Sequence, residues 1–334
     1  MLVAEMSRPL HAALLVAAVL ALGACGSARQ DAAPDQAATL LLDFQPNAIH
    51  TGIYLAVARG YDDALGVNLR IRAPSDSTDA VKLLVSGRAE LAILDIHDLA
   101  LARERGRDLV GVMAIVQVPL ASILAQAGVA RPRDLEGRRV GVTGLPSDDA
   151  ILRSIVAGDG GDPDKVRTTT IGFTAVASLL TGRVDAATGF WNAEGVALRA
   201  KRPGIQEFRV DDYGAPAYPE LVLTVSRETL QDQPSLVRAT VAALSRGYSE
   251  VLSDPENGVG ALLDATRGVP RDAVARELQA VSPAFTAGAR AFGELNRERL
   301  QAWARWEQRF GIVRQPLDVA RAFDGRYVPS DKRD

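Results

Sequence analysis

The chain has 334 residues, with 38 basic and 41 acidic side chains and a formal net charge of −3. A chain of this length is too long to fold around one ordinary hydrophobic core, so we expect two lobes. Because charges of both signs are spread along the sequence, we expect no nucleic-acid partner.

The N-terminal stretch is typical of an exported bacterial lipoprotein. Its apolar run, residues 12–22, follows Arg8 and is shorter than a membrane-spanning helix. The run closes with Leu-Gly-Ala-Cys, and Cys25 is the only cysteine. This pattern resembles a lipobox, in which the cysteine becomes the lipid-modified first residue, whereas a free structural thiol is the alternative. We expect a signal peptide over residues 1–24, lipidation of Cys25 and a flexible tether over 25–38; a start at Met6 would change none of this.

Three units of strand, polar loop and helix follow the tether. The sequence predicts strands over residues 39–44, 67–72 and 90–94, and helices over 51–58, 80–86 and 98–105. A glycine after each helix allows the left-handed turn that ends it. This recurrence predicts a parallel sheet of crossover units whose loops meet at one edge.

A polar segment at residues 130–137 predicts the crossing into a second lobe. Further strands are expected over residues 139–143, 168–171, 184–189 and 208–210, and a strand over 221–225 should return the chain to the first lobe. Amphipathic helices follow, with Trp303 and Trp306 as packing residues on one helix face. The predicted fold is therefore two-lobed α/β, with residues 39–128 and 222–334 in lobe 1 and residues 129–221 in lobe 2.

The loops that follow these strands are acidic and aromatic. Ligands of open α/β sheets bind at the carboxyl ends of strands, so these loops should form the binding cleft. They contain no Arg or Lys, and the helix start at Ser147 brings its own carboxylates, which disfavours an anionic ligand. An amino-substituted aromatic heterocycle fits better, since its amine can donate to a carboxylate while its ring stacks on an aromatic side chain. The alternative is that many of these aromatic residues belong to the core.

Both histidines outside the leader, His50 and His97, stand where a predicted strand leads into a helix. They are candidates for ligand hydrogen bonding, for general base chemistry, or for metal binding with Asp95 and Asp98; capped surface histidines are the bland alternative. The Asp-x-His-Asp spacing defines no coordination shell, so we expect no metal. The sequence has no Gly-x-Ser-x-Gly elbow and no thiol apart from Cys25, so nucleophilic catalysis is not indicated.

Several loop motifs occur together in one known family. Residues 42–54 read Leu-Asp-Phe-Gln-Pro-Asn-Ala-Ile-His-Thr-Gly-Ile-Tyr, residues 189–194 read Gly-Phe-Trp-Asn-Ala-Glu, and residues 212–216 read Asp-Tyr-Gly-Ala-Pro. Over about residues 40–252 the chain resembles the extracytoplasmic thiamine-pyrimidine-precursor binding proteins of ABC importers, in the SsuA/THI5-like and NMT1/THI5-like group. Phe44 stands where the family has tryptophan, which keeps a stacking face of smaller area.

The resemblance implies a type II periplasmic-binding-protein-like fold that closes on its ligand as a hinged clamp. It implies a monomer, lipid-anchored to the outer face of the bacterial membrane, that delivers a small aromatic heterocycle such as an aminopyrimidine to permease and ATPase subunits, with no cofactor and no metal. With the loop chemistry above, the candidate ligand-binding residues are Asp43, Phe44, Asn47, His50, Asp95, His97, Ser147, Phe173, Trp191, Asn192, Glu194, Tyr213, Tyr218 and Glu220.

The thiamine pyrimidine synthases of the wider group are an alternative. That branch carries a lysine four residues before the histidine matched by His97, and Ile93 occupies the place here. It also carries a cysteine-rich block, which residues 214–219 replace. Since no cleft loop has a lysine to bind pyridoxal phosphate, we expect no enzyme activity. A third reading keeps the binding role for a sulfonate, nitrate or riboflavin-like ligand.

Overall fold

The computed structural model describes residues 36–76 and 78–329. The predicted signal peptide, Cys25 and residues 25–35 of the predicted tether lie outside this part. Strand β1 begins at Gln36, so residues 36–38 are not tether, because they pair with β2 from Val67 onward. Among the described residues, no helix combines the length and apolar character needed to cross a membrane.

The first sheet has the strand order β2-β1-β3-β10-β4. Strands β1, β2 and β3 are parallel, whereas β10 runs antiparallel to both β3 and β4. Successive residues of β1 pack into two different hydrophobic cores, Leu40 on one face of the sheet and Leu41 on the other, as expected for a sheet covered on both sides. The strands are β1 (Gln36–Leu41), β2 (Val67–Arg72), β3 (Leu91–Asp95), β4 (Leu109–Ala114) and β10 (Leu221–Ser226).

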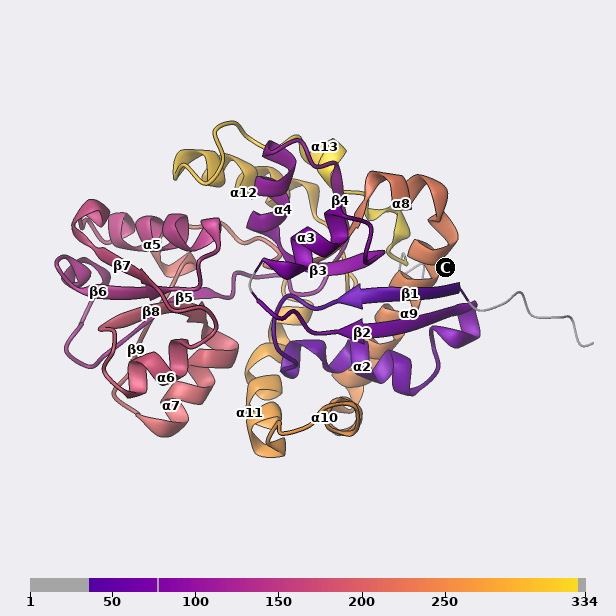
Figure 1. Ribbon diagram of the computed structural model, residues 1–334, viewed down its shortest axis with the longest axis horizontal. Helices are drawn as coiled ribbons and strands as arrows, with labels where there is room; N and C mark the ends of the chain where they lie inside the picture. The colour runs from indigo at the N-terminus through magenta and orange to yellow at the C-terminus, as the bar shows by residue number, and fades with distance from the viewer. Residues whose placement is uncertain (1–35, 77, 330–334) are drawn as a thin grey trace, which may run out of the picture. The chain divides into compact units, whose positions relative to one another are not determined.

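Helices cover both faces of this sheet, as Figure 1 shows. Helices α3 (Asp79–Val85) and α4 (Ile96–Glu104) lie on one face and α2 (Thr51–Ala58) on the other. The predicted helix over residues 51–58 is confirmed, and the first predicted strand lies three residues earlier than expected. The loop after β1 is therefore longer than expected, and it includes Asp43 and Phe44.

The second sheet has the order β7-β6-β8-β5-β9, in which β5 is antiparallel to its neighbours β8 and β9. Its strands are β5 (Ala121–Ala125), β6 (Arg139–Val142), β7 (Arg167–Thr170), β8 (Ala186–Phe190) and β9 (Gln206–Arg209). Helices α5 (Pro146–Gly158), α6 (Ala175–Leu180) and α7 (Val196–Lys201) flank it (Figure 1).

Two crossing segments, residues 115–120 and 210–220, join the sheets. The first lies earlier than the expected crossing at residues 130–137, because β5 already belongs to the second sheet. The prediction from sequence placed this crossing too late. Residues 110–125 are apolar almost throughout and are buried on both sides of the crossing, so no polar break marks it. The return of the chain through β10 is confirmed.

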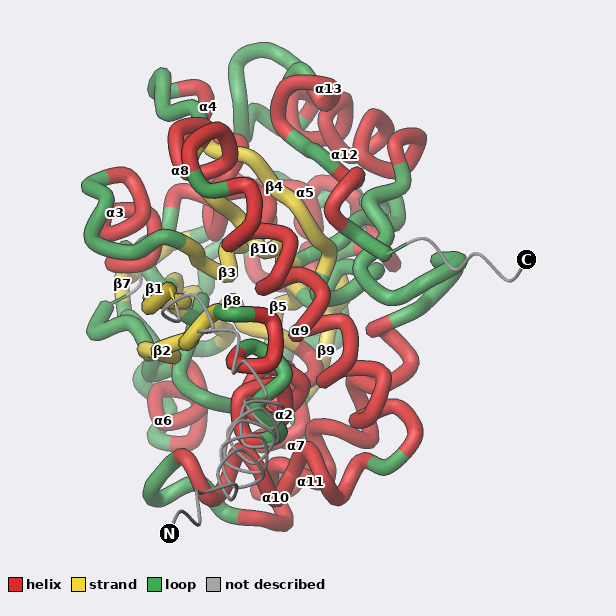
Figure 2. The backbone as a smooth tube through the Cα atoms, turned by 90° about the vertical axis from the view of Figure 1, so that its right-hand side faces the viewer, coloured by secondary structure: helices red, strands yellow, loops and turns green. Residues whose placement is uncertain are grey.

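Helices make up most of the C-terminal region, and the longest of them packs on the N-terminal helix (Figure 2). Tyr248 of α9 donates its hydroxyl to the Ile49 carbonyl oxygen at 2.7 Å. Trp303 and Trp306 are buried packing residues, as predicted. The helices are α8 (Arg227–Asp232), α9 (Pro234–Ser253), α10 (Pro255–Ala265), α11 (Arg271–Val281), α12 (Arg297–Arg309) and α13 (Val319–Ala322).

Short turns complete the secondary structure. The 3-10 turns are Ala48–His50, Asp63–Leu65, Pro132–Leu135, Pro163–Lys165, Asp211–Tyr213, Ser282–Phe285 and Gly325–Tyr327. Trp191–Gly195 forms one π-helical turn between β8 and α7. Such turns often mark functional regions, and this one places Glu194 in the cleft described next.

Candidate ligand-binding cleft

A cavity lies between the two sheets, at the carboxyl ends of their parallel strands. The first lobe lines it with the loop after β1, the end of β3 and the first turn of α4. The second lobe lines it with the starts of β5 and α5, the end of β8 and the π-helical turn. Seven of the predicted residues line this cavity, namely Asp43, Phe44, Asn47, Asp95, Ser147, Phe173 and Glu194.

The aromatic part of the lining comes from both lobes. The rings of Phe44 and Phe173 meet edge to face, with 4.4 Å between their centroids. Phe190 at the end of β8 supplies a third ring. Because Phe44 belongs to the first lobe and Phe173 to the second, their contact closes part of the cleft directly. A flat aromatic ligand would therefore meet ring faces or edges from either side.

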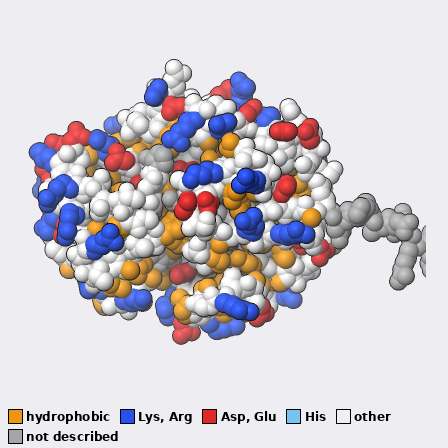
Figure 3. Space-filling view, in the orientation of Figure 1, with side chains coloured by type: hydrophobic (Ala, Val, Ile, Leu, Met, Phe, Trp, Pro, Cys, Tyr) orange, Lys and Arg blue, Asp and Glu red, His pale blue; other side chains and the backbone are white. Residues whose placement is uncertain are grey.

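Five carboxylates line the cavity, and no lysine or arginine lies among its described lining residues. Burial raises the pKa values of Glu194 and Asp148 above their usual range. Burial, with the nearby Asp148 charge, raises the pKa of Asp98 to about 7. On the face seen in Figure 3, side chains of both signs are present and basic ones are the more frequent, in contrast to the lining of the cavity. The five are Asp43, Asp95, Asp98, Asp148 and Glu194.

Apart from Ser147, the hydroxyl groups of the second lobe that line the cavity were not predicted. Thr143 and Thr188 donate to the two oxygens of Asp148 at 2.6 and 3.1 Å. Ser122, at the start of β5, donates to the Gly189 carbonyl oxygen at 2.9 Å. These residues stand inside or beside apolar strands, so only their position at strand ends could have indicated them. They hold the cleft wall and its acidic groups in place.

His50 lies behind the cavity wall. Its Nε2 is 2.9 Å from Oδ1 of Asp43, and the Asn47 N–H donates to its Nδ1 at 3.2 Å. Because Nδ1 accepts, the ring carries its proton on Nε2 and donates it to Asp43. His50 is fully buried and does not line the cavity. The prediction that it contacts ligand is replaced by a supporting role for Asp43.

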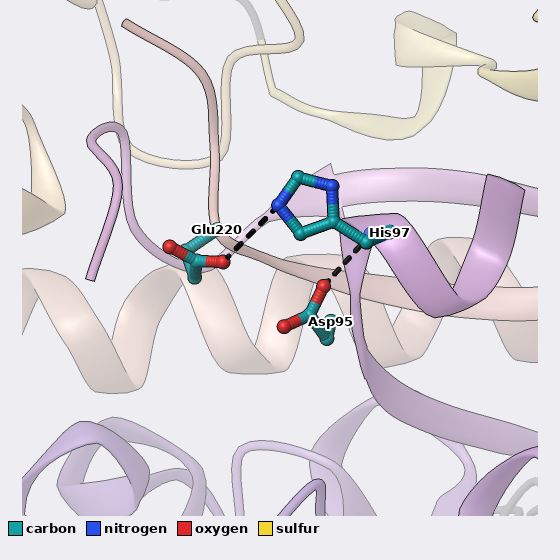
Figure 4. Close-up of side chains that lie close together, drawn as sticks. All are labelled: Asp95, His97 and Glu220. Carbon is teal, nitrogen blue, oxygen red and sulfur yellow. Dashed lines mark hydrogen bonds and ion pairs between the residues drawn. The ribbon is translucent and has the colours of Figure 1, made fainter. Parts of the chain in front are cut away.

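His97 also lies behind a cleft carboxylate, in the buried cluster of Figure 4. Its backbone N–H donates to Oδ1 of Asp95 at 2.8 Å. On the ring, Nδ1 is 2.7 Å from Oε1 of Glu307 and Nε2 is 3.1 Å from the Tyr218 hydroxyl. Burial lowers the pKa of His97 to about 3, so the ring is neutral at ordinary pH. The ring does not line the cavity, against expectation.

The two predicted tyrosines are packing residues. Tyr218 is fully buried against His97, Trp303 and Trp306, at ring-centroid distances of 5.1, 6.5 and 5.9 Å. Tyr213 packs edge to face on Phe208 in the second lobe. Neither lines the cavity, because Tyr218 is fully buried and Tyr213, which is partly buried, packs on the second lobe instead.

Trp191 and Asn192 likewise turn away from the cavity. Trp191 Nε1 donates to the Pro119 carbonyl oxygen at 2.9 Å, and the Arg209 guanidinium lies 4.1 Å from its ring centroid. The ring is thus occupied by contacts with the first crossing, and the predicted stacking face is not offered to the cleft. Asn192 is fully buried, with neither polar side-chain atom hydrogen-bonded to a described residue.

Glu220 is buried behind Asp95. One oxygen of Asp95, one ring nitrogen of His97 and one oxygen of Glu220 lie within 4.8 Å of one another. Such a set could be considered for a metal, but Asp95 and Glu220 already accept backbone N–H groups and His97 Nε2 is near the Tyr218 hydroxyl. This arrangement fits a hydrogen-bonded network better than a coordination shell, so we assign no metal.

Comparison with known proteins relates the chain to one family. The NMT1/THI5 like family model matches residues 47–258. The formylaminopyrimidine-binding protein of Halalkalibacterium halodurans is 33% identical over 255 residues, which are 75% of this chain and 77% of that protein. The 4-amino-5-hydroxymethyl-2-methylpyrimidine phosphate synthase of Legionella pneumophila is 23% identical, over 87% of this chain and 92% of that protein.

Solved structures share the fold. The alkanesulfonate-binding protein SsuA from Xanthomonas axonopodis pv. citri, bound to MOPS, matches with a TM-score of 0.70 and 18% identity. The match covers 88% of this chain and 100% of that chain. The predicted two-lobed α/β fold of the periplasmic-binding-protein kind is therefore confirmed.

Proposed function

Because the chain belongs to the NMT1/THI5-like family, we propose that it is a solute-binding protein of an ABC importer whose cleft binds an aminopyrimidine or a similar small aromatic heterocycle. The family match confirms the resemblance inferred from the loop motifs. The relative named as a formylaminopyrimidine-binding protein supports a binding role.

The chemistry of the cleft lining carries this proposal. Five carboxylates can accept hydrogen bonds from an exocyclic amine, and the phenylalanine rings can pack on a planar heterocycle. A sulfonate or nitrate would meet these carboxylates with no lysine or arginine among the described lining residues to pair with it. The lining therefore favours a ligand rich in donors over an anion.

The proposal includes the absence of catalysis. Ile93, which occupies the place of the synthase lysine, is fully buried and lines the cavity. No lysine lies among the described lining residues, so a pyridoxal phosphate Schiff base would have no amine in the cleft. One relative is named as a synthase. The buried Ile93 and the absence of a lysine from the described lining residues nevertheless support the binding role.

The proposed location and partners follow from the leader and the family. A lipid on Cys25 would anchor the chain to the outer face of the bacterial cell membrane, with the two lobes free to present ligand. The partners would be the permease and ATPase subunits of an importer, and the protein would act as a monomer. Cys25 lies outside the described residues, so this part rests on the sequence pattern.

Titration calorimetry tests the ligand class. The probes are 4-amino-5-hydroxymethyl-2-methylpyrimidine, its analogue with oxygen in place of the amine, and taurine. We expect the aminopyrimidine to bind, the deaminated analogue to bind more weakly, and taurine to give no binding heat. Tight binding of taurine would contradict the argument from the cleft lining.

The Glu194→Gln variant tests the recognising carboxylate. Glu194 lines the cleft and accepts the Phe190 N–H at 3.0 Å. Replacing part of the acceptor with a donor should weaken aminopyrimidine binding by about 1–3 kcal/mol and leave the deaminated analogue less affected. The matched control is Glu256→Gln, an exposed residue paired with Arg271 outside the cavity. If Glu194→Gln binds both probes as the wild type does, the amine is recognised elsewhere.

A further inference from the structure

One buried carboxylate joins the two crossing segments. Glu220, on the second crossing, is fully buried. Its Oε2 accepts the N–H of Leu120, the last residue of the first crossing, and at 2.9 Å the N–H of Ala121, the first residue of β5. Any change in the relative angle of the lobes must act through these two segments. A change in the angle between the lobes would therefore alter the hydrogen bonds of Glu220.

The other oxygen of Glu220 faces the His97 ring, beside Asp95 of the cleft lining (Figure 4). Oε1 of Glu220 has no hydrogen-bond partner in the described part of the chain and lies 3.7 Å from Nε2 of His97. One oxygen of Asp95, which lines the cavity, and one oxygen of Glu220 lie within 4.8 Å of each other. Two carboxyl groups this close, of which Glu220 is fully buried and Asp95 partly buried, are not both ionised, since mutual repulsion and desolvation retain a proton.

The groups around this pair supply no positive charge to replace the proton. His97 on α4 is held neutral, with its pKa lowered by burial to about 3. The other ionisable groups facing the pair are acidic, and Arg105 acts on Asp98 rather than on the pair. They are Asp98 on α4 with Asp148 beyond it on α5, Glu307 on α12, Asp211 on the 3-10 turn after β9, and the Tyr218 hydroxyl on the second crossing.

We propose that Asp95 and Glu220 share one proton, and that a ligand amine donating to Asp95 moves this proton onto Oε1 of Glu220. The O–H bond on Asp95 breaks, the O–H bond on Glu220 forms, and the charge of the pair is unchanged. Glu220 is thereby a positioning residue, which sets the ionisation of a cleft carboxylate while tying the two crossings together. This inference rests on the proposed function for the amine ligand, but the shared proton itself does not.

The pair makes binding dependent on pH. Burial raises the pKa of Glu220 to about 7, and burial with the Glu220 charge raises the pKa of Asp95 well above its usual range. Below about pH 7 Glu220 therefore already carries a proton and cannot take up the one on Asp95, so an amine that needs an ionised Asp95 must release one proton to solvent. Affinity should fall by up to about tenfold per pH unit below pH 7, and above that pH the proton only moves within the pair.

Calorimetry with 4-amino-5-hydroxymethyl-2-methylpyrimidine at pH 6 and pH 8, in two buffers of different ionisation heat, measures the released protons. For the wild type we expect release of about one proton at pH 6 and little at pH 8. In Glu220→Gln the side-chain oxygen still accepts the two N–H groups, while its amide donates to Asp95 and keeps it ionised. This variant should bind at both pH values and lose most of the difference between them.

Two further variants serve as controls. Asp62→Asn is matched in kind, since Asp62 is buried, accepts the Leu69 N–H at 2.9 Å and leaves Oδ1 without a described partner, away from the cleft. It should retain the wild-type pH dependence. Glu277 also has a pKa of about 7 and lies outside both the cavity lining and the pair, so Glu277→Gln measures its own share. The part lost in Glu220→Gln should persist in this variant.

A measurement without ligand separates this inference from the proposed function. In wild-type protein the backbone amide resonances of Leu120 and Ala121, which donate to Glu220, should shift together with a midpoint near pH 7. If they titrate while the aminopyrimidine does not bind, the proposed ligand is wrong and the shared proton stands. If they do not titrate, or if Glu220→Gln keeps the full pH dependence of binding, the inference is overturned.

Discussion

Two of the three cleft carboxylates in the first lobe, Asp43 and Asp95, are each held by a histidine whose ring does not line the cavity. His50 donates from its ring to Asp43, and His97 donates from its backbone to Asp95. A carboxylate held in this way keeps one orientation before ligand arrives, which lowers the entropy lost on binding. The sequence predicted that both histidines belong to the site, but it could not distinguish a contact from a support, because that depends on which way each side chain turns.

Removing the His50 ring should cost both stability and affinity. In His50→Leu the Asn47 N–H and the Asp43 carboxylate each lose a buried partner. An unsatisfied buried polar group costs about 1–3 kcal/mol, so we expect urea denaturation to show a loss of this order. Binding of the aminopyrimidine should weaken as well. Unchanged affinity in a folded His50→Leu protein would show that Asp43 needs no support from this ring.

At the scale of elements, the N-terminal helix α2 and the long helix α9 cross at unusually short range. A Cβ atom on Gly52 would lie 2.4 Å from the Tyr248 ring, and one on Gly247 would lie 2.1 Å from the Gly52 carbonyl oxygen. Glycine is needed here for the close approach of two helices rather than for a turn. This contact fixes the loop after β1, because Tyr248 also holds the Ile49 carbonyl oxygen.

Two glycine-to-alanine changes in helices should therefore have opposite effects. Gly52→Ala forces a methyl group into the Tyr248 ring and should destabilise the fold by about 1–3 kcal/mol. Gly260→Ala in α10 meets no atom within 4 Å and should stabilise by about 0.4–1 kcal/mol, since alanine loses less backbone freedom on folding. Thermal denaturation of both variants measures the difference. Equal effects would contradict the close helix crossing.

Several elements were predictable because local pattern decides them. The strand Val67–Arg72 and the helix Thr51–Ala58 have the expected bounds, since a clear periodicity ends in a glycine or a polar loop. The first crossing was not predictable, because its apolar residues are as buried as those of the strands on either side. For the same reason Trp191 was taken as a stacking surface, since burial against Pro119 leaves no trace in the local sequence.

At the scale of the whole molecule, buried acids dominate the response to pH. The pKa values of Asp98, Glu220 and Glu277 are each raised to about 7, with burial as the largest cause. In the unfolded chain such groups titrate near 4, so between about pH 4 and pH 7 the folded protein binds more protons. His97 acts in the opposite sense, because its pKa is lowered to about 3 and the unfolded chain alone takes up its proton below about pH 6.5. Because three acidic groups stabilise the folded state at mildly acidic pH and only one histidine opposes them, the folded state is favoured at mildly acidic pH.

We therefore expect the ligand-free protein to be more stable to urea at pH 5.5 than at pH 8. The contribution of the three acids is fully present below their unfolded pKa values and is lost as the pH rises through about 7, whereas the His97 term lowers stability only below about 6.5. Glu277→Gln removes one acid that is outside the Asp95 and Glu220 pair, so it should reduce the difference in stability between the two pH values without abolishing it.

The affinity for the aminopyrimidine should change in the other direction and strengthen from pH 6 to pH 8. Binding needs an ionised carboxylate, whereas the carboxylates of the ligand-free cleft are more stable in the neutral form. A protein that is least stable at pH 5.5 would show that these carboxyl groups are hydrated and ionised in the folded state.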